Sequence, residues 1–283
     1  TGTVVTRSLA PGCNPSQVGS GPARDILVRG LDALLIQSGI AEPKIAATHL
    51  YLAGSPQFWQ ETAAQLSGFG AVRAGPDSLP VLELATAGEA GLVLHAGTGS
   101  FVSARAPDGT VHYAGGLGWK LGDAGSGFDL GRRAIALALL ELQARPSVGA
   151  PPLSPLAAAL AIHTGFDDYA GNSRFFYNDA AANATITAFA PKVLELAERN
   201  CAPARQAVTD SVTDLARLAD QVIHRLFPSP VGSVRCGVSG RLLNSPPAAR
   251  ALRAFAAQLR WAVDLHFITE APIEGVRRLL AKT

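Results

Sequence analysis

The chain has 283 residues, and its 24 Lys and Arg against 22 Asp and Glu leave a formal net charge of +2 at pH 7. With aromatic residues at only 6%, it lacks the basic, aromatic-rich surface that is typical of nucleic-acid-binding proteins. No run of 18 or more apolar residues occurs, so the sequence predicts no membrane-spanning helix. We expect a cytoplasmic protein without nucleic-acid or membrane partners.

The cysteines and histidines indicate neither a disulfide framework nor a metal site. Cys13, Cys201 and Cys236 are odd in number and far apart in the sequence, as in proteins of the reducing cytosol. The six histidines never recur at a spacing of four residues. The sequence alone therefore identifies no metal ligand, although its length allows two domains with a sizeable core.

Helix-like and strand-like patterns alternate over the first ninety residues. Apolar spacing and turn residues predict a helix over 24–37, a strand over 49–53, a helix over 57–66, a weak strand around Val72 and a helix over 79–87. Such an alternation favours an α/β fold with mixed sheets.

A strand at residue 92 opens the remainder of the chain, and a hairpin over 101–113 follows it, with Pro107-Asp108-Gly109 as its turn. An apolar helix is predicted over 128–143 and a Pro-rich loop over 144–155, whereas 163–190 is irregular. The later patterns predict helices over 191–200 and 203–227, a strand to Cys236 with a turn over 237–240, a helix over 247–258, a strand over 262–268 and a helix over 272–281.

Two glycine-rich segments frame this hairpin. Gly97-Thr98-Gly99-Ser100 follows the strand at 92, and residues 115–123 follow the hairpin and end in Asp123. Glycines let a charged ligand approach the backbone, while Thr98 and Ser100 offer hydroxyl and N–H donors to phosphate oxygens. A turn of this composition is also common as an ordinary hairpin corner. It is neither a P-loop nor a dinucleotide fingerprint.

The order of these segments resembles the second phosphate motif of the N-acetylglucosamine kinase and BadF/BadG/BcrA/BcrD ATPase group, within the actin and hexokinase superfamily. In that group a strand enters A-G-T-G-S, and G-G-x-G-x-x-x-G-D-E-G-S follows a hairpin. Residues 115–126 read GGLGWKLGDAGS, with Ala124 in place of Glu. Weaker similarity covers nearly the whole chain. The resemblance implies two RNase H-like (actin-like ATPase) domains flanking a nucleotide and sugar cleft.

The resemblance also implies a domain division. We expect an N-terminal domain over 1–90 and a C-terminal domain over 91–271, with 272–283 packing back on the first. The first five residues, TGTVV, resemble the end of the hairpin after the family's first phosphate loop, D-G-G-G-T. We therefore expect that loop, which helps to hold the metal and nucleotide, to precede Thr1. The sequence contains no Met.

As a function, the resemblance implies ATP- and Mg²⁺-dependent phosphorylation of a sugar, N-acetylglucosamine or glucosamine, at its 6-hydroxyl. We expect a homodimer. Gly97–Ser100 would hold the terminal phosphates. Gly237 and Gly240, in a segment that resembles the adenosine motif, would contact the nucleoside, although a plain strand-to-helix turn would look the same.

Asp77 is the candidate catalytic residue. Transfer of a phosphoryl group to a hydroxyl usually needs a carboxylate that takes the proton. Asp77 lies between a predicted strand and a predicted helix, and it matches the family's T-D-A position. An aspartate that caps this helix would look the same locally, and both roles are compatible, because a helix N-terminus also tunes a carboxylate.

Four further residues match sugar-contacting positions of the family, and two of them have a structural alternative. Asn14 is also a turn residue, and Asp123 is also a candidate cap for the helix at 128. Gly54 ends a strand, and Gly116 matches a glycine whose backbone faces the sugar ring. Trp119 stands two positions from the tryptophan expected in animal enzymes, so core packing is an equal alternative for it.

Two other functions stay open at this stage. A BadF-type ATPase would activate a partner enzyme and carry an iron–sulfur cluster held by cysteines, but the three cysteines are widely spaced. A sugar-binding sensor without catalysis is compatible with Ser55, Ala124 and Ser239, which replace expected residues. A serine hydrolase is disfavoured, because no G-x-S-x-G occurs. We expect His95, on an apolar strand, to be a core residue.

Overall fold

The computed structural model describes residues 3–40, 44–146, 149, 151–228 and 232–282. It divides into two compact units, one of Thr1–Leu84 with Glu270–Thr283 and the other of Ala85–Thr269. The sequence-based division at residues 90 and 271 remains a prediction about domains.

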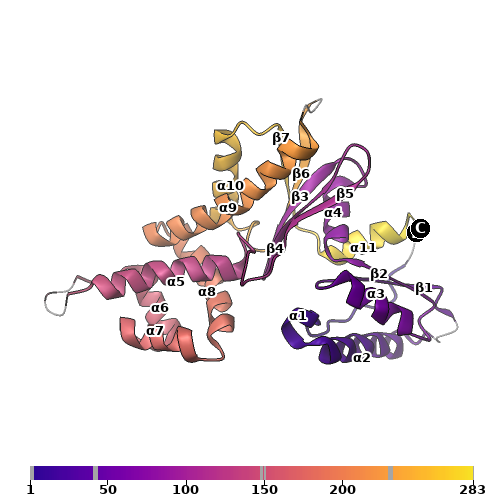
Figure 1. Cartoon of the computed structure of the whole chain (residues 1–283), viewed down its shortest axis with the longest axis horizontal. Helices are drawn as coiled ribbons and strands as arrows, with labels where there is room; N and C mark the ends of the chain where they lie inside the picture. The colour runs from indigo at the N-terminus through magenta and orange to yellow at the C-terminus, as the bar shows by residue number, and fades with distance from the viewer. Residues whose placement is uncertain (1–2, 41–43, 147–148, 150, 229–231, 283) are drawn as a thin grey trace. The chain divides into compact units, whose positions relative to one another are not determined.

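The first unit is built on two parallel strands, β1 (Ala47–Leu52) and β2 (Ala71–Pro76). The helix α3 (Pro56–Gln65) connects them, and α1 (Pro15–Val18) and α2 (Ser20–Ser38) precede β1 (Figure 1). These elements confirm the predicted alternation. Their core consists of apolar side chains from α2, β1 and α3, namely Ala23, Leu27, Leu50, Trp59 and Ala63. Residues 3–13 form neither helix nor strand, and Thr1 and Gly2 lie outside the described residues.

Two helices complete the first unit, α4 (Ser78–Thr86), which crosses into the second unit at its end, and α11 (Pro272–Leu280). They pack closely, because a Cβ at Gly275 would stand only 2.0 Å from the carbonyl oxygen of Pro80. Lys282 Nζ pairs with the buried Glu83 at 2.5 Å, and Arg7 pairs with Glu274 at 2.6 Å. The last helix is therefore part of the first unit.

The second unit contains a five-stranded sheet in the order β5-β4-β3-β6-β7. Its strands are β3 (Gly91–Ala96), β4 (Ser100–Arg105), β5 (Val111–Gly115), β6 (Val234–Ser239) and β7 (Val263–Ile268). β4 pairs antiparallel with both β3 and β5, and β4 and β5 form the predicted hairpin. β6 pairs parallel with both β3 and β7. The carboxyl ends of β3 and β6 therefore lie side by side, where parallel sheets commonly bind ligands.

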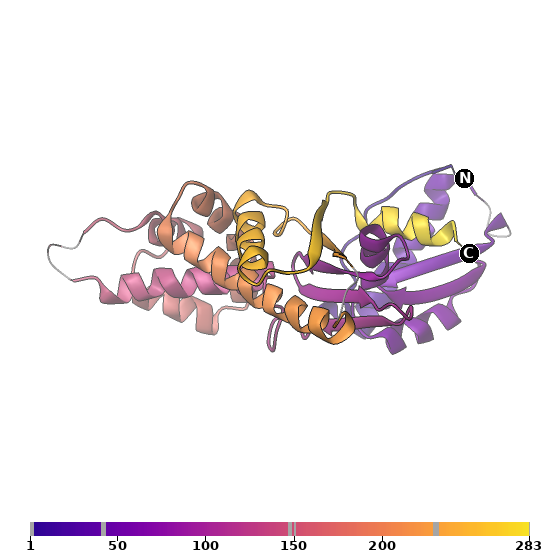
Figure 2. The same ribbon diagram turned by 90° about the horizontal axis from the view of Figure 1, so that it is seen from above.

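Within the described residues, six helices complete the second unit. They are α5 (Gly127–Ala144), α6 (Pro155–Thr164), α7 (Tyr169–Asn178), α8 (Ala182–Glu198), α9 (Ala202–Leu226) and α10 (Pro246–Gln258). Of these, α9 packs along β3, β4 and β5. Alternate strand residues such as Leu92 and Leu94 point toward these helices and join Phe189, Leu215 and Leu252 in one core. Figure 1 shows α5 to α8 grouped together, and Figure 2 shows α10 lying against α9.

Two sequence-based expectations about elements were wrong. Residues 163–190 are not irregular, because α7 occupies part of them and α8 begins at Ala182 and continues through Pro191. Packing against α5 supports α8, since Gly131 lets the backbone of Ile186 approach closely. The expected turn over 237–240 is also shorter, because pairing with β3 and β7 extends β6 to Ser239.

Candidate functional site

The turn between β3 and β4 is narrow and held by its own backbone. The N–H of Gly97 donates to the carbonyl of Gly99 at 2.9 Å, and Ala96 pairs with Ser100 across the hairpin. Thr98 is exposed at the tip, so its hydroxyl and N–H are available to a ligand. Ser100 is buried, and its hydroxyl donates to the carbonyl of Ala124 at 2.6 Å. That hydroxyl is therefore engaged within the protein, and the phosphate contact expected of Ser100 remains a prediction.

The second glycine-rich segment folds directly against this turn. The N–H of Gly127 donates to the carbonyl of Gly97 at 2.8 Å, and the N–H of Gly116 donates to the carbonyl of Ser100 at 3.1 Å. Gly116 has a positive φ of 63°, and a Cβ there would collide with the ring of Tyr113. The position thus requires glycine, and its role in sugar binding remains a prediction.

Asp123 stands at the centre of this arrangement, with a φ of 59°. Its Oδ1 accepts the N–H of Gly118 at 3.1 Å, and its Oδ2 would stand 3.2 Å from a Cβ at Gly99. Burial raises the pKa of its carboxyl, against the opposing effect of the Gly118 hydrogen bond. The alternative that Asp123 caps α5 is wrong, because Ser126 is the cap and accepts the N–H of Asp129 at 3.1 Å.

Gly240, in the predicted adenosine segment, lies against the end of β3, next to the Gly97–Ser100 turn. Its φ is 97°, and a Cβ there would stand 2.1 Å from the carbonyl oxygen of Ala96, the last residue of β3. The turns after β3 and β6 therefore touch. Gly237 lies inside β6, where a Cβ would stand 2.5 Å from the Cβ of Ala85. Packing alone explains this glycine, and its nucleotide contact remains a prediction.

His95 occupies a more polar position than a core histidine. Its Nδ1 lies 3.2 Å from the hydroxyl of Ser239, at the carboxyl end of the neighbouring parallel strand, and its ring stacks on Phe101 at 5.0 Å. Burial lowers the pKa of the imidazole, which favours the neutral ring. Trp119 is also not a core residue, since it is 41% exposed and contacts Phe128 and Lys120.

In the first unit, the candidates lie at the carboxyl edge of the two-stranded sheet. Gly54 follows β1 and Asp77 follows β2, and these parallel strands end opposite each other at Leu52 and Pro76. Burial raises the pKa of the Asp77 carboxyl, and hydrogen bonds from its own N–H and that of Ser78 oppose this. A carboxylate with a raised pKa at such an edge is a reasonable proton acceptor.

Asn14 lies beside Gly54. Its side chain accepts the N–H of Ser16 at 3.0 Å and so caps α1, which confirms its structural role. A Cβ at Gly54, whose φ is 109°, would stand 3.0 Å from the Asn14 Oδ1 and 2.8 Å from Pro15. The structure thus brings together two of the predicted sugar contacts, whose binding role remains a prediction.

The relationships of the chain follow from comparison with known proteins. A model of the BadF/BadG/BcrA/BcrD ATPase family matches residues 1–253. The chain belongs to this family. A candidate N-acetylglucosamine kinase from Chromobacterium violaceum is 27% identical, with a TM-score of 0.72 over 97% of this chain and 89% of that one. A candidate N-acetylglucosamine kinase from Porphyromonas gingivalis is 20% identical, with a TM-score of 0.67 over 93% and 86%. No curated protein matches the chain significantly.

These findings confirm the expected two-domain, actin-like α/β fold and the family. Membership of this ATPase family makes ATP the expected nucleotide. None of the helices in the described part of the chain is long and apolar enough to span a membrane. The same residues contain no group of three or more His, Cys, Asp and Glu side chains arranged to hold a metal ion.

Two residues that support the site in this family member were not predicted. Asp129 is buried at the start of α5 and accepts the N–H of Gly125 at 3.2 Å, which fixes the segment that carries Asp123. Asn244 donates to the carbonyls of Gly240 and Ile268 at 3.0 and 2.9 Å. The Ser126-x-x-Asp129 spacing, which is similar to a capping box, was a signal for the first residue.

Proposed function

We propose that this protein is an ATP-dependent kinase that phosphorylates N-acetylglucosamine or glucosamine at the 6-hydroxyl. The observation that carries the proposal is the junction of three segments in the second unit. There the Gly97–Ser100 turn accepts backbone hydrogen bonds from the glycine-rich segment that carries Asp123. Gly240 packs against Ala96, directly before this turn. The similarity to a candidate N-acetylglucosamine kinase, at 27% identity, supports the choice of sugar.

In the proposed reaction, the sugar hydroxyl oxygen forms a bond to the γ-phosphorus of ATP, and the bond from that phosphorus to the β,γ-bridging oxygen breaks. ADP leaves with that oxygen, and the hydroxyl proton passes to Asp77. Because burial raises the pKa of Asp77, its carboxylate is a better proton acceptor than an exposed aspartate. Exclusion of water from the site would prevent competing hydrolysis of ATP.

The other candidates have binding roles in this proposal. The backbone N–H groups of the turn and the hydroxyl of Thr98 would contact the terminal phosphates, and Gly240 would let the adenosine lie close to the backbone. The sugar contacts would come from Asn14, Gly54, Gly116 and Asp123.

Mg²⁺ would neutralise part of the phosphate charge when it binds with ATP. In such sites the ion keeps several waters and is held by one or two carboxylates together with phosphate oxygens. Asp123, whose Oδ2 faces Gly99 while its Oδ1 accepts the N–H of Gly118, fits this set of donors, and as a ligand of the ion it would contact the sugar only indirectly. The expected homodimer and the cytoplasmic location remain predictions.

A coupled assay of ADP release tests the proposal. The panel contains N-acetylglucosamine, glucosamine, glucose, N-acetylmannosamine and a reaction without sugar. We expect rapid release only with N-acetylglucosamine or glucosamine. A further reaction with 6-deoxy-N-acetylglucosamine, which lacks the accepting hydroxyl, should give none. Release at the same rate without sugar, or equal activity on the 6-deoxy analogue, would contradict the proposed reaction.

A further inference from the structure

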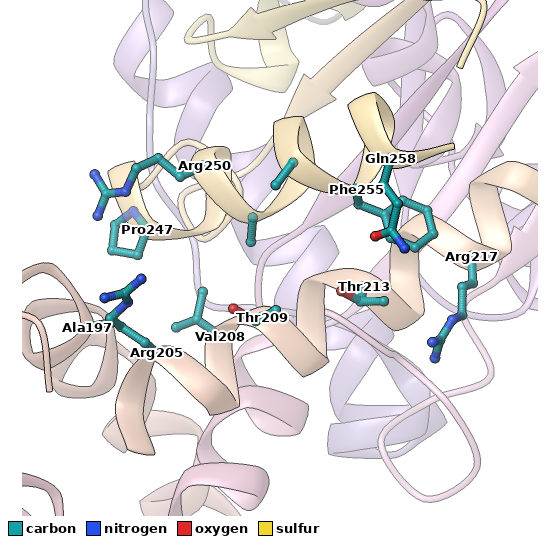
Figure 3. A pocket seen from close by; sticks show the side chains of 12 residues that line it. Ala197, Arg205, Val208, Thr209, Thr213, Arg217, Pro247, Arg250, Phe255 and Gln258 are labelled. Carbon is teal, nitrogen blue, oxygen red and sulfur yellow. The ribbon is translucent and has the colours of Figure 1, made fainter. Parts of the chain in front are cut away.

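A groove with a volume of about 360 Å³ runs between α9 and α10 in the second unit (Figure 3). This volume is within the range of small-molecule sites. Val208, Ala251 and Phe255 form part of an apolar floor, to which threonine hydroxyls add polar groups. Arg205, Arg217 and Arg250 are the charged residues of its lining, which contains no Asp or Glu. The groove is therefore apolar inside and cationic at its borders.

Two of these arginines lack a counter-charge. Arg205 and Arg250 are exposed, and their guanidinium groups have no hydrogen bond or ion pair within the part of the chain that the structure describes. Figure 3 shows both at the end of the groove where Pro247 lies, with Arg217 toward the other end. Like charges that share a site repel one another, and a bound phosphate or carboxylate would relieve this repulsion through charge-assisted hydrogen bonds.

The third arginine begins a chain of ion pairs that leads into the protein. Arg217 pairs with Asp214 at 2.8 Å, Asp214 with Arg133 at 2.6 Å, and Arg133 with Asp129 at 2.9 Å. The exposed fraction of these side chains falls along the chain from 66% through 35% and 25% to 6%. We call these four residues the ion-pair chain. It connects the groove surface with a buried carboxylate.

The inner end of the ion-pair chain supports the predicted phosphate turn. Asp129 Oδ2 accepts the hydroxyl of Ser211 at 2.8 Å and the N–H of Gly125 at 3.2 Å. The segment that contains Gly125 also carries Asp123, and Gly127 binds the carbonyl of Gly97. A change in the charge balance at Asp129 therefore reaches the turn through backbone hydrogen bonds.

We propose that the groove is a second binding site, for an organic anion with an apolar body and a phosphate or carboxylate group, and that the ion-pair chain couples it to the phosphate turn. The negative charge of an anion in the groove attracts Arg217, which lies toward the other end of the groove, and weakens its pairing with Asp214. Asp214 then attracts Arg133 more strongly, and Arg133 neutralises Asp129 less. The added negative potential beside Asp123 opposes nucleotide phosphates, so groove ligand and nucleotide weaken each other reciprocally. The coupling rests on the proposed nucleotide site, whereas binding in the groove does not.

Binding in the groove is tested with phenyl phosphate, titrated calorimetrically into protein saturated with ADP, so that the nucleotide site is filled. We expect one site per chain and weaker binding of inorganic phosphate, which lacks the apolar body. The double variant Arg205→Gln/Arg250→Gln should weaken binding at least about tenfold, as expected for the loss of two charge-assisted contacts. Arg253→Gln is the matched control, because Arg253 is also on α10 but lies over Phe267 at 4.4 Å.

Absence of binding, or equal binding by the double variant, would overturn the groove site. Complete displacement of phenyl phosphate from the groove by ADP would also overturn it, because the groove would then belong to the nucleotide site. The variants need a melting temperature close to that of the wild type for the comparison.

The coupling is tested by ADP affinity with and without saturating phenyl phosphate. We expect ADP to bind at least about threefold more weakly in its presence, a small effect for coupled sites. Asp214→Asn should retain phenyl phosphate binding and abolish this difference. An unchanged ADP affinity in the wild type, or an unchanged difference in Asp214→Asn, would overturn the coupling. Groove binding without any ADP binding would overturn the coupling together with the proposed kinase function, and would leave the groove site intact.

Discussion

Asp77 is the residue on which proton transfer depends in the proposed reaction. Asp77→Asn should reduce turnover roughly 10²–10⁴-fold, because a general base acts mainly in the transition state. Sugar affinity should stay within a few-fold. Steady-state kinetics with N-acetylglucosamine measure both quantities, and Asp25→Asn, an exposed carboxylate on α2, serves as the control. Turnover near that of the wild type would remove Asp77 from the mechanism.

The pH dependence of turnover gives a second test of Asp77. A base must be ionised, so activity should fall on the acid side as its carboxyl takes up a proton. Because burial raises the pKa of Asp77 above its ordinary value of 3.8, this fall should begin at a higher pH than for an exposed aspartate. The residual activity of Asp77→Asn should lack this acid limb.

A substitution of Gly99 tests whether the Gly97–Ser100 turn binds the nucleotide phosphates. A Cβ at this position would stand 3.2 Å from Asp123 Oδ2, so Gly99→Val forces a branched side chain against that carboxylate and the ligand. We expect ADP affinity to fall about tenfold or more, by analogy with the cost of overpacking. Calorimetric titration measures it. Gly21→Ala is the control, because nothing lies within 4 Å of a Cβ there. A folded Gly99→Val variant with normal ADP affinity would make the turn an ordinary hairpin corner.

At the scale of elements, α5 and α9 are joined through one buried carboxylate. Burial alone would raise the pKa of Asp129, but the hydrogen bonds of Ser211 and Gly125 and the charge of Arg133 outweigh it and lower the pKa. The carboxylate is therefore ionised and well paired where α5 begins. Removal of one partner leaves part of this charge uncompensated, which is costly inside a protein.

Ser211→Ala tests how much the hydrogen bond to Asp129 contributes to the stability of the protein. It removes a 2.8 Å hydrogen bond to a buried charge, so the free energy of unfolding should fall by about 1.5–3 kcal/mol. Urea denaturation gives the value. Thr209→Ala, at an exposed position of the same helix, should change it by less than about 0.5 kcal/mol. Equal effects of the two substitutions would mean that the Asp129 junction contributes little to stability.

At the scale of the whole molecule, the cysteines separate a sugar kinase from an activating ATPase. Cys201 and Cys236 are buried, and Cys13 is half-buried. A variant with Cys13→Ser, Cys201→Ala and Cys236→Ala should keep ADP formation that depends on sugar, at nearly the wild-type rate and at a temperature well below unfolding. Protein purified without oxygen should contain no iron. Stoichiometric iron that is lost with the cysteines, together with sugar-independent hydrolysis, would support the activator instead.

The sequence by itself determined the parts of this protein that depend on neighbouring residues. The glycine-rich turns after β3 and β5 could be predicted because their composition and spacing involve only neighbouring residues. The hairpin of β4 and β5 was predicted from its Pro-Asp-Gly turn, and the amphipathic helix α9 from its apolar period. The position of Asp77 between a strand and a helix was equally visible.

Only the tertiary structure decided which distant residues meet. Ser100 and Ala124, or Asp129 and Ser211, are 24 and 82 residues apart, and no local pattern pairs them. The same holds for α8, which continues through Pro191 because its packing against α5 outweighs the local preference for a helix start at proline. The sequence also predicts a turn at Gly237, whereas the structure places this residue inside β6. Pairing of β6 with β3 and β7 causes the difference, and the sequence around Gly237 does not reveal these partner strands. Composition specifies turns and periods, whereas burial, pairing and charge neutralisation depend on partners that the fold alone brings together.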